Sequence, residues 1–464
     1  MIVVISDLHF EEEASDIICG EDERPPLIFR RNLHPRAYRE FIAGVADQAR
    51  CRRVRNFDLV IAGDLFDFDR TLLWFEDELR PYVSLSSFAP PLEAKLLRIL
   101  DAIASEPVVK GALDCFQLLS QGRYRPREDD LSSNEELDFP AERISIHYLP
   151  GNHDRLANAT ASVRRRIRAL LGLSGDASFD HKILFDDPAA LVRHGHEYDP
   201  NCFALDISGQ ANIPLDLPEA AYAEPVFGDF ITIDVAVQLP YLFRKKYGDQ
   251  QIFHDKVLSS LYLRLLQLDD VRPQSALLAY LLDASSGDFT EEQAWERLVP
   301  VFEMLLDRIH SDRYFRQWMR QRANSWTPAL LDLSRGMLKV GAGGNRIARE
   351  FARVLAHHFL GGATERPELV ARREDAVKRG AARFVLAGHT HFPQVSLIAS
   401  DALGDRFYIN TGTWRTHIPA TPDQRAFGQM KALTYVLLSA SKEAPQDAGP
   451  NLGCFNYWTA YTSL

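Results

Sequence analysis

Five separate stretches of the sequence carry side chains that bind metal ions. Carboxylate and imidazole together suit Mn, Fe, Co and Zn, and an Asn carbonyl adds a harder ligand of the kind that Mn and Mg accept. No cysteine belongs to the set, which argues against a structural zinc site. The stretches are Asp7-Leu8-His9, Asp64-Leu65-Phe66-Asp67, Asn152-His153-Asp154, His194-Gly195-His196 and His389-Thr390-His391.

The number of these groups predicts more than one metal ion. Seven candidate ligands are too many for a single ion, but they suit two ions that share one carboxylate. Two divalent ions about 3.5–4 Å apart are the usual device for hydrolysing phosphoryl bonds. The sequence therefore favours hydrolytic chemistry at a dinuclear centre.

Each stretch directly follows a short apolar run of the kind that forms a buried strand. Ligands in open α/β sheets bind beyond the carboxyl ends of the strands, so these side chains are expected to meet at one edge. A single Asp after a strand is as often a turn residue or a helix cap, but five such strand ends are hard to explain in that way. The runs are Ile2–Ile5, Leu59–Ala62, Ile144–Leu149, Ala190–Arg193 and Arg383–Ala387.

Composition indicates a soluble globular protein. The chain has 464 residues, of which 46% are hydrophobic and 25% charged, and a net charge of −11, which two divalent ions would bring to about −7. That balance gives no general attraction for nucleic acid or anionic membranes. The five cysteines form no Cys-x-x-Cys pair, the first strand begins at Ile2, and no apolar run approaches the length of a membrane span. These features predict a cytoplasmic enzyme without a transmembrane segment.

The spacing between the stretches predicts a core with insertions. A helix is expected over 36–55, an insertion with at least one helix over about 68–143, and a mainly helical cap over 199–364. Residues 1–198 and 365–464 would form the core. Three strands within 407–414, 433–438 and 455–461 suggest a second sheet that closes the chain.

The charged segments of the sequence are interpreted mainly as solvent-exposed surface. Glu11-Glu12-Glu13 and the acidic patch over 125–138 are expected in solvated loops. The segment 313–322 mixes aromatic residues with arginines, which would suit stacking and phosphate contact. The favoured interpretation is an amphipathic helix with an arginine-rich outer face.

The five motifs resemble, in type and in order, those of the calcineurin-like metallophosphoesterases. The resemblance covers some twenty-five residues and neither insertion. It implies an α/β fold: a double β-sandwich flanked by helices (α/β/β/α), with the large helical insertions forming a cap. It also implies two divalent metal ions, for which Mn is favoured and Fe, Zn, Co or Mg are alternatives.

The resemblance also implies a role for each motif residue. Asp7, His9, Asp64 and His391 would hold the first ion, and Asp64, Asn152, His194 and His389 the second, with Asp64 as the bridge. His153 would contact the phosphate and protonate the leaving group, and Asp154 would orient it. Asp67 is expected to support the ligands. Lower in rank, His196, Arg155 and Asn201 are candidates for substrate contact, and His196 is also the alternative to His194 as ligand.

The reaction implied is hydrolysis of a phosphodiester or pyrophosphate-type bond by a metal-bridging hydroxide. A large cap suggests a phosphate-ester small molecule or an extended phosphodiester as substrate. A nuclease is the main alternative and would need a local basic groove. A non-catalytic metal-binding scaffold is disfavoured, because the candidate ligands and His153 are all present.

Overall fold

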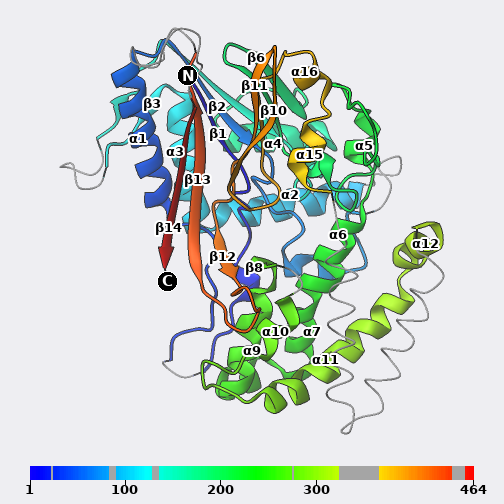
Figure 1. The fold of residues 1–464 in the computed structure, drawn as a ribbon. Coiled ribbons are helices and arrows are strands. Elements are labelled where there is room, and N and C mark those ends of the chain that lie inside the picture. Colours follow the sequence, from blue (N-terminus) through cyan, green and yellow to red (C-terminus); the bar gives the residue numbers. More distant parts are fainter. Residues whose placement is uncertain are drawn as a thin grey trace.

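The computed structural model describes residues 1–21, 24–82, 90–127, 135–273, 276–322, 365–440 and 455–463, and these form a mixed α/β fold with several sheets. The two large sheets pack face to face, with helices on their outer faces and a helical region at one end (Figure 1). All five predicted strands that precede a motif are present, and they are divided between the two sheets.

The first sheet holds three of the motif strands. β1, β2 and β5 are parallel neighbours, so their carboxyl ends lie at the same edge. β13 pairs antiparallel with β1, and β14 and β12 pair with β13. The strands are β1 Ile2–Ile5, β2 Asn56–Ala62, β5 Arg143–Leu149, β8 Val271–Arg272, β12 Thr416–Pro419, β13 Met430–Leu438 and β14 Phe455–Ser463.

The second sheet holds the other two motif strands. β7 and β11 flank β9 and run parallel to it, while β6 and β10 pair antiparallel at the two edges. The strands are β6 Lys182–Asp186, β7 Ala189–Arg193, β9 Phe384–Ala387, β10 Gln394–Asp401 and β11 Gly404–Asn410. A separate two-stranded ribbon joins β3 Arg123–Tyr124 to β4 Leu137–Asp138.

The two sheets share one apolar layer. Alternate residues of β1 and β2, such as Val4 and Val60, meet Val192, Leu386 and Ile409 of the second sheet in a single buried cluster. Both faces of the central strands are covered, which explains their uninterrupted apolar runs.

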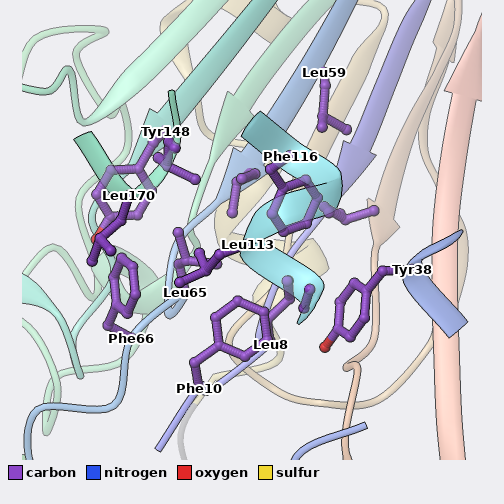
Figure 2. Packing of buried hydrophobic residues seen from close by; sticks show 14 of the residues in the cluster. Leu8, Phe10, Tyr38, Leu59, Leu65, Phe66, Leu113, Phe116, Tyr148 and Leu170 are labelled. Carbon is purple, nitrogen blue, oxygen red and sulfur yellow. The ribbon is translucent and has the colours of Figure 1, made fainter. Parts of the chain in front are cut away.

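Helices cover the two outer faces. On the first sheet, α1 Pro35–Arg52, α2 Pro90–Ser105, α3 Pro107–Ser120 and α4 Ala161–Leu170 pack into one large cluster. Figure 2 shows its centre, where Phe116 and Leu113 of α3 lie among Tyr38, Leu65 and Phe66. On the second sheet, α15 Pro367–Ala371 and α16 Asp375–Lys378 pack against Val385 and Tyr408. The layers are therefore helix, sheet, sheet and helix.

A mainly helical region follows the fourth motif and has its own apolar cluster. Ile18, Tyr82 and Ile418 join that cluster from outside, and β8 pairs with β12, so the region is attached to the first sheet. Its helices are α5 Glu219–Ala223, α6 Phe227–Ile231, a π-helical turn Thr232–Val237, α7 Gln238–Tyr247, α8 Asp249–His254, α9 Lys256–Leu266, α10 Leu277–Leu282, α11 Glu291–Ser311 and α12 Arg313–Arg322.

Some predictions about this region stay open. The last part of the predicted cap, residues 323–364, lies outside the described residues, as do residues 128–134 of the acidic patch and the side chains of 318–322 in the arginine-rich segment. The helix over 313–322 is present as α12. The division of the chain after residue 198 and before residue 365 stays a prediction.

The interpretation of the three last strands was wrong. β11 belongs to the second sheet, beside β9, whereas β13 and β14 complete the first sheet beside β1. Residues 411–414 also lie beyond the end of β11. The turn-rich segments after β11 carry the chain from one sheet to the other, which local sequence does not reveal.

The prediction of a solvated loop at Glu11-Glu12-Glu13 was also wrong. All three glutamates are buried. Glu13 accepts hydrogen bonds from the backbone of Arg31 and Asn32, at 2.7 and 2.9 Å, and Glu11 lies 3.1 Å from the Arg31 guanidinium. Their carboxylates are buried because the neighbouring segment supplies N–H donors and a cation.

One helical stretch of the described residues, Glu219–Tyr247, is long and apolar enough to cross a membrane. Its length and apolar character differ from the prediction that no apolar run approaches the length of a membrane span. The most apolar part of the stretch is 61% buried inside the protein, and core helices of soluble proteins have the same length and composition.

Candidate metal centre

Asp64 lies at the centre of the site. β2 ends at Ala62, and Gly63, with φ +91°, turns the chain so that the Asp64 side chain lies buried between the two sheets' strand ends. Its Oδ1 accepts a hydrogen bond of 2.9 Å from the backbone of His153. Its Oδ2 has no hydrogen-bond partner among the described residues, and His194 Nε2 and His9 Nε2 lie 3.1 and 3.6 Å away.

The charge of Asp64 is held by its surroundings. Burial alone would raise its pKa, but the imidazoles of His194 and His153 hold the pKa of Asp64 well below its ordinary value. A buried carboxylate oxygen that is ionised and lacks a donor is an unusual and costly arrangement. A cation would satisfy it.

Asp7, His9 and His391 form one group of potential ligands beside Asp64. One ligand atom from each lies within 4.8 Å of the others. His391 Nε2 is 3.3 Å from Asp7 Oδ1 and 2.9 Å from His9 Nε2. The other nitrogen of His9, Nδ1, is 2.8 Å from Asp67 Oδ2, a contact that keeps the proton on Nδ1 and leaves the Nε2 lone pair facing the group.

His194 and His389 form a second group with Asp64. Asn152 belongs to it, since its Oδ1 lies 2.9 Å from His389 Nδ1 and 3.2 Å from His194 Nε2. His194 Nδ1 donates to the Ala62 carbonyl at 2.7 Å, so Nε2 is the nitrogen that faces Asp64 and is available to a metal ion. The structure thus brings all seven predicted ligands together in two groups around one shared carboxylate, and groups of this composition could hold divalent metal ions.

The backbone at the ligands is strained. Among the described residues, seven other than glycine have positive φ, and five of these are candidate ligands. Such conformations cost about 1–3 kcal/mol each and persist where the surrounding structure holds them in place. The five are Asp7 (φ 53°), His9 (45°), Asp64 (51°), His389 (69°) and His391 (58°).

Two glycines allow the loops that carry the candidate ligands to pack closely against one another. A Cβ at Gly388 would overlap the Asp7 carboxylate and Ser6, and one at Gly151 would overlap Asp64 and lie 2.7 Å from the His194 ring. Close packing of the loops therefore requires glycine at both positions.

His153 lies at the edge of the two groups, with 13% of its side chain exposed. Its Nδ1 is 3.1 Å from Asp67 Oδ1, and its ring packs edge-on against His9. Burial alone would lower its pKa, but the charges of Asp67 and Asp64 raise the pKa of His153 to about 9. At neutral pH the imidazole is protonated, as a proton donor must be.

The predicted role of Asp154 was wrong. Its carboxylate makes no hydrogen bond to the His153 ring. It instead accepts hydrogen bonds of 2.5–2.8 Å from the backbone N–H groups of Leu65 and Gly151 and from the Tyr148 hydroxyl. It therefore holds the loop that carries Asp64. Asp67 is the carboxylate that contacts His153, and its contact with His9 confirms the expected supporting position.

The three lower-ranked residues have different surroundings. His196 is buried, and its ring packs near those of His194 and His389. The Arg155 guanidinium is occupied by Asp229 at 2.8 Å and by the carbonyls of Pro81 and Ala223, which leaves no free edge for substrate. Asn201 is exposed, and its substrate contact, like that of His196, stays a prediction.

Sequence reasoning missed several supporting residues. Asp199 Oδ2 lies 3.3 Å from His389 Nε2 and, with Cys202, forms a further group near that imidazole. The stretch after β11 holds the first motif: Thr413 and Trp414 donate to the Asp7 carbonyl, and Thr411 contacts Ser6. Asn410-Thr411-Gly412-Thr413 lies at the end of β11, which runs parallel to β9. Polar residues with a glycine at the end of an apolar strand are the same signal that identified the five motifs. Arg272, which contacts His391, carried no such signal.

In comparisons with known proteins, no protein-family model, no curated protein and no solved structure gave a significant match to the chain.

Proposed function

We propose that this chain is a metal-dependent phosphoesterase of the calcineurin-like metallophosphoesterase type, acting on a phosphodiester or pyrophosphate-type bond. One observation carries the proposal: six potential ligands from four distant segments lie around Asp64, whose buried Oδ2 has no hydrogen-bond partner among the described residues, and a protonated histidine lies at the edge of the group. The order of helix, sheet, sheet and helix also agrees with the double β-sandwich that the motifs imply.

Asp64 would be the shared ligand of two cations. Asp7, His9 and His391 would complete one set, and Asn152, His194 and His389 the other. When bound, the cations would supply Lewis acidity, lowering the pKa of water and neutralising charge on the phosphoryl oxygens. Mn is favoured, because the set mixes imidazole, carboxylate and an amide oxygen.

The chain's own residues supply proton transfer and orientation. Asp67 holds His153 through Nδ1, which leaves Nε2–H as the proton that the imidazole can give to a leaving oxygen. The same carboxylate orients His9 through its other oxygen. Asp67 therefore couples the proton donor to a metal ligand.

The test is hydrolysis by the purified protein after metal removal and reloading. The protein is stripped with a chelator, reloaded separately with Mn, Fe, Zn, Co or Mg, and assayed with an aryl phosphodiester, an aryl phosphomonoester, a dinucleoside pyrophosphate and single-stranded DNA. Asp64→Asn is the inactive comparison, and bound metal is measured by elemental analysis.

We expect metal-dependent cleavage of a diester or pyrophosphate by the wild-type chain and none by Asp64→Asn. Metal binding without turnover of any substrate would overturn the proposal in favour of a scaffold. Preference for DNA, with strong salt dependence of binding, would favour the nuclease.

A further inference from the structure

Arg272 brings a cation from the helical region to the candidate metal centre. It ends the short strand β8, which pairs parallel with β12 of the first sheet. Its Nη2 donates to Nδ1 of His391 at 3.2 Å. Its Nη1 donates to the carbonyls of Asp269 and Val271 at 2.6 and 2.9 Å. The two backbone carbonyls thus fix Nη1, and Nη2 is directed to the metal centre.

This arginine differs from the buried arginines around it. Arg31, Arg70, Arg155, Arg193 and Arg415 each have a carboxylate oxygen at 3.1 Å or less. Among the described residues no carboxylate oxygen lies within 4.0 Å of the Arg272 guanidinium, and Asp270 beside it is paired with Arg415 at 2.6 Å. A partly buried guanidinium without an anion is costly and would be stabilised by one.

The contact with His391 cannot persist when that residue is a ligand. His391 Nε2 faces Asp7 and His9, so Nε2 is the nitrogen directed to the metal group. A neutral imidazole with a lone pair on Nε2 carries its hydrogen on Nδ1. Nδ1–H cannot accept from Arg272, and Nη2 is then free to donate to another acceptor beside the first set of ligands.

We propose that Arg272 binds the substrate's phosphoryl group, making the helical region a direct contributor to the active site. The inference rests on the proposed function. Guanidinium is suited to this role, because its N–H groups match two phosphoryl oxygens and its charge is independent of pH. The anchoring carbonyls hold Nη1, so Nη2 and Nε are the donors available for the anion.

The experiment measures phosphate binding without turnover. Wild-type protein loaded with Mn is titrated with inorganic phosphate by calorimetry, alongside Arg272→Gln and Arg272→Lys. The control is Arg297→Gln, which removes an exposed arginine from α11 of the same helical region. Metal content and thermal unfolding are measured for every variant.

We expect Arg272→Gln to retain its metal and to bind phosphate about ten- to hundredfold more weakly, the usual worth of charge-assisted hydrogen bonds. The phosphate affinity of Arg272→Lys should lie between those of Arg272→Gln and the wild type, because lysine keeps the positive charge but lacks the paired N–H donors of the guanidinium. Arg297→Gln should bind as the wild type does. If Arg272→Gln does not fold, the comparison of Arg272→Lys with Arg297→Gln decides.

Unchanged phosphate affinity in Arg272→Gln, or in Arg272→Lys if only that variant folds, would overturn the inference, as would absence of phosphate binding in the wild type. Neither result touches hydrolysis, which is measured separately. Conversely, phosphate binding that depends on Arg272 in a chain that hydrolyses none of the substrates would refute the phosphoesterase and leave Arg272 as an anion-binding residue.

Discussion

Replacing Asp67 with Asn tests the coupling between proton donor and metal ligand. The Asp67 carboxylate is fully buried, and each of its oxygens faces two N–H donors. Oδ1 lies 3.1 Å from His153 Nδ1 and 3.2 Å from the Arg70 backbone nitrogen. Oδ2 lies 2.8 Å from His9 Nδ1 and 3.0 Å from Arg70 Nε. An Asn side chain has the same shape but only one acceptor oxygen.

The amide cannot satisfy both sides. Whichever way it is turned, its NH₂ group faces two donors, and an unsatisfied buried donor costs about 1–3 kcal/mol. Loss of the charge also weakens the buried pair with Arg70, although Arg70 keeps Asp269. We expect a loss of about 3 kcal/mol in the free energy of unfolding, the lower end of the usual cost of breaking a buried pair.

The functional loss should be larger if Asp67 supports both histidines. Removing the partner of a ligating histidine costs about 10–100-fold in metal affinity, and a misplaced general acid costs about 10²–10⁴ in turnover. Metal affinity is measured by titration of the stripped protein, and turnover at saturating metal with the aryl phosphodiester.

Asp58→Asn is the matched control. Asp58 also contacts an imidazole, that of His147 at 2.9 Å, and it lies on the same strand β2 but away from the metal centre. It should change neither metal affinity nor turnover. Wild-type metal affinity and turnover in Asp67→Asn would refute the reasoning, as would equal losses in the control.

Three further predictions address other parts of the site. His153→Ala should retain its metal and lose about 10²–10⁴ in turnover, measured with elemental analysis and steady-state kinetics; equal activity would remove His153 from the mechanism. Gly388→Ala should weaken metal binding and lower the melting temperature, since the methyl group would overlap Asp7 and Ser6. Gly428→Ala is the control, because its φ, like that of Gly388, is not positive and its Cβ would meet no atom closer than 3.9 Å; equal effects of the two substitutions would contradict the overlap. The metal-free protein should lose stability as pH rises. Burial would lower the pKa values of His153 and His194, but nearby carboxylates raise them from 6.5 to about 9 and about 10. The resulting stabilisation is complete below pH 6.5 and is lost as pH rises through those values, by about 1.4 kcal/mol for each unit by which a pKa is raised. Thermal unfolding between pH 6.5 and 10 measures it, and a flat profile without metal would contradict the charge assignments.

The sequence by itself determined the five motif strands and the groups that follow them. A largely apolar run of four to six residues that stops at glycine or a polar residue is a local signal, because strand burial and turn formation depend on adjacent residues. Metal-binding side chains are also recognised by type alone. For these reasons the seven candidate ligands could be selected before their positions in space were known.

Only the tertiary structure decided which residues support the ligands. Asp154 and Asp67 are both aspartates close to a motif histidine in sequence, yet Asp154 holds a backbone loop and Asp67 contacts His153. Glu11 to Glu13 look solvated until a later segment is found to cover them. Arg272 lies 119 residues from His391 in sequence. Such contacts join distant segments, and the free energy that selects them comes from burial and pairing in the folded chain, which no local pattern records.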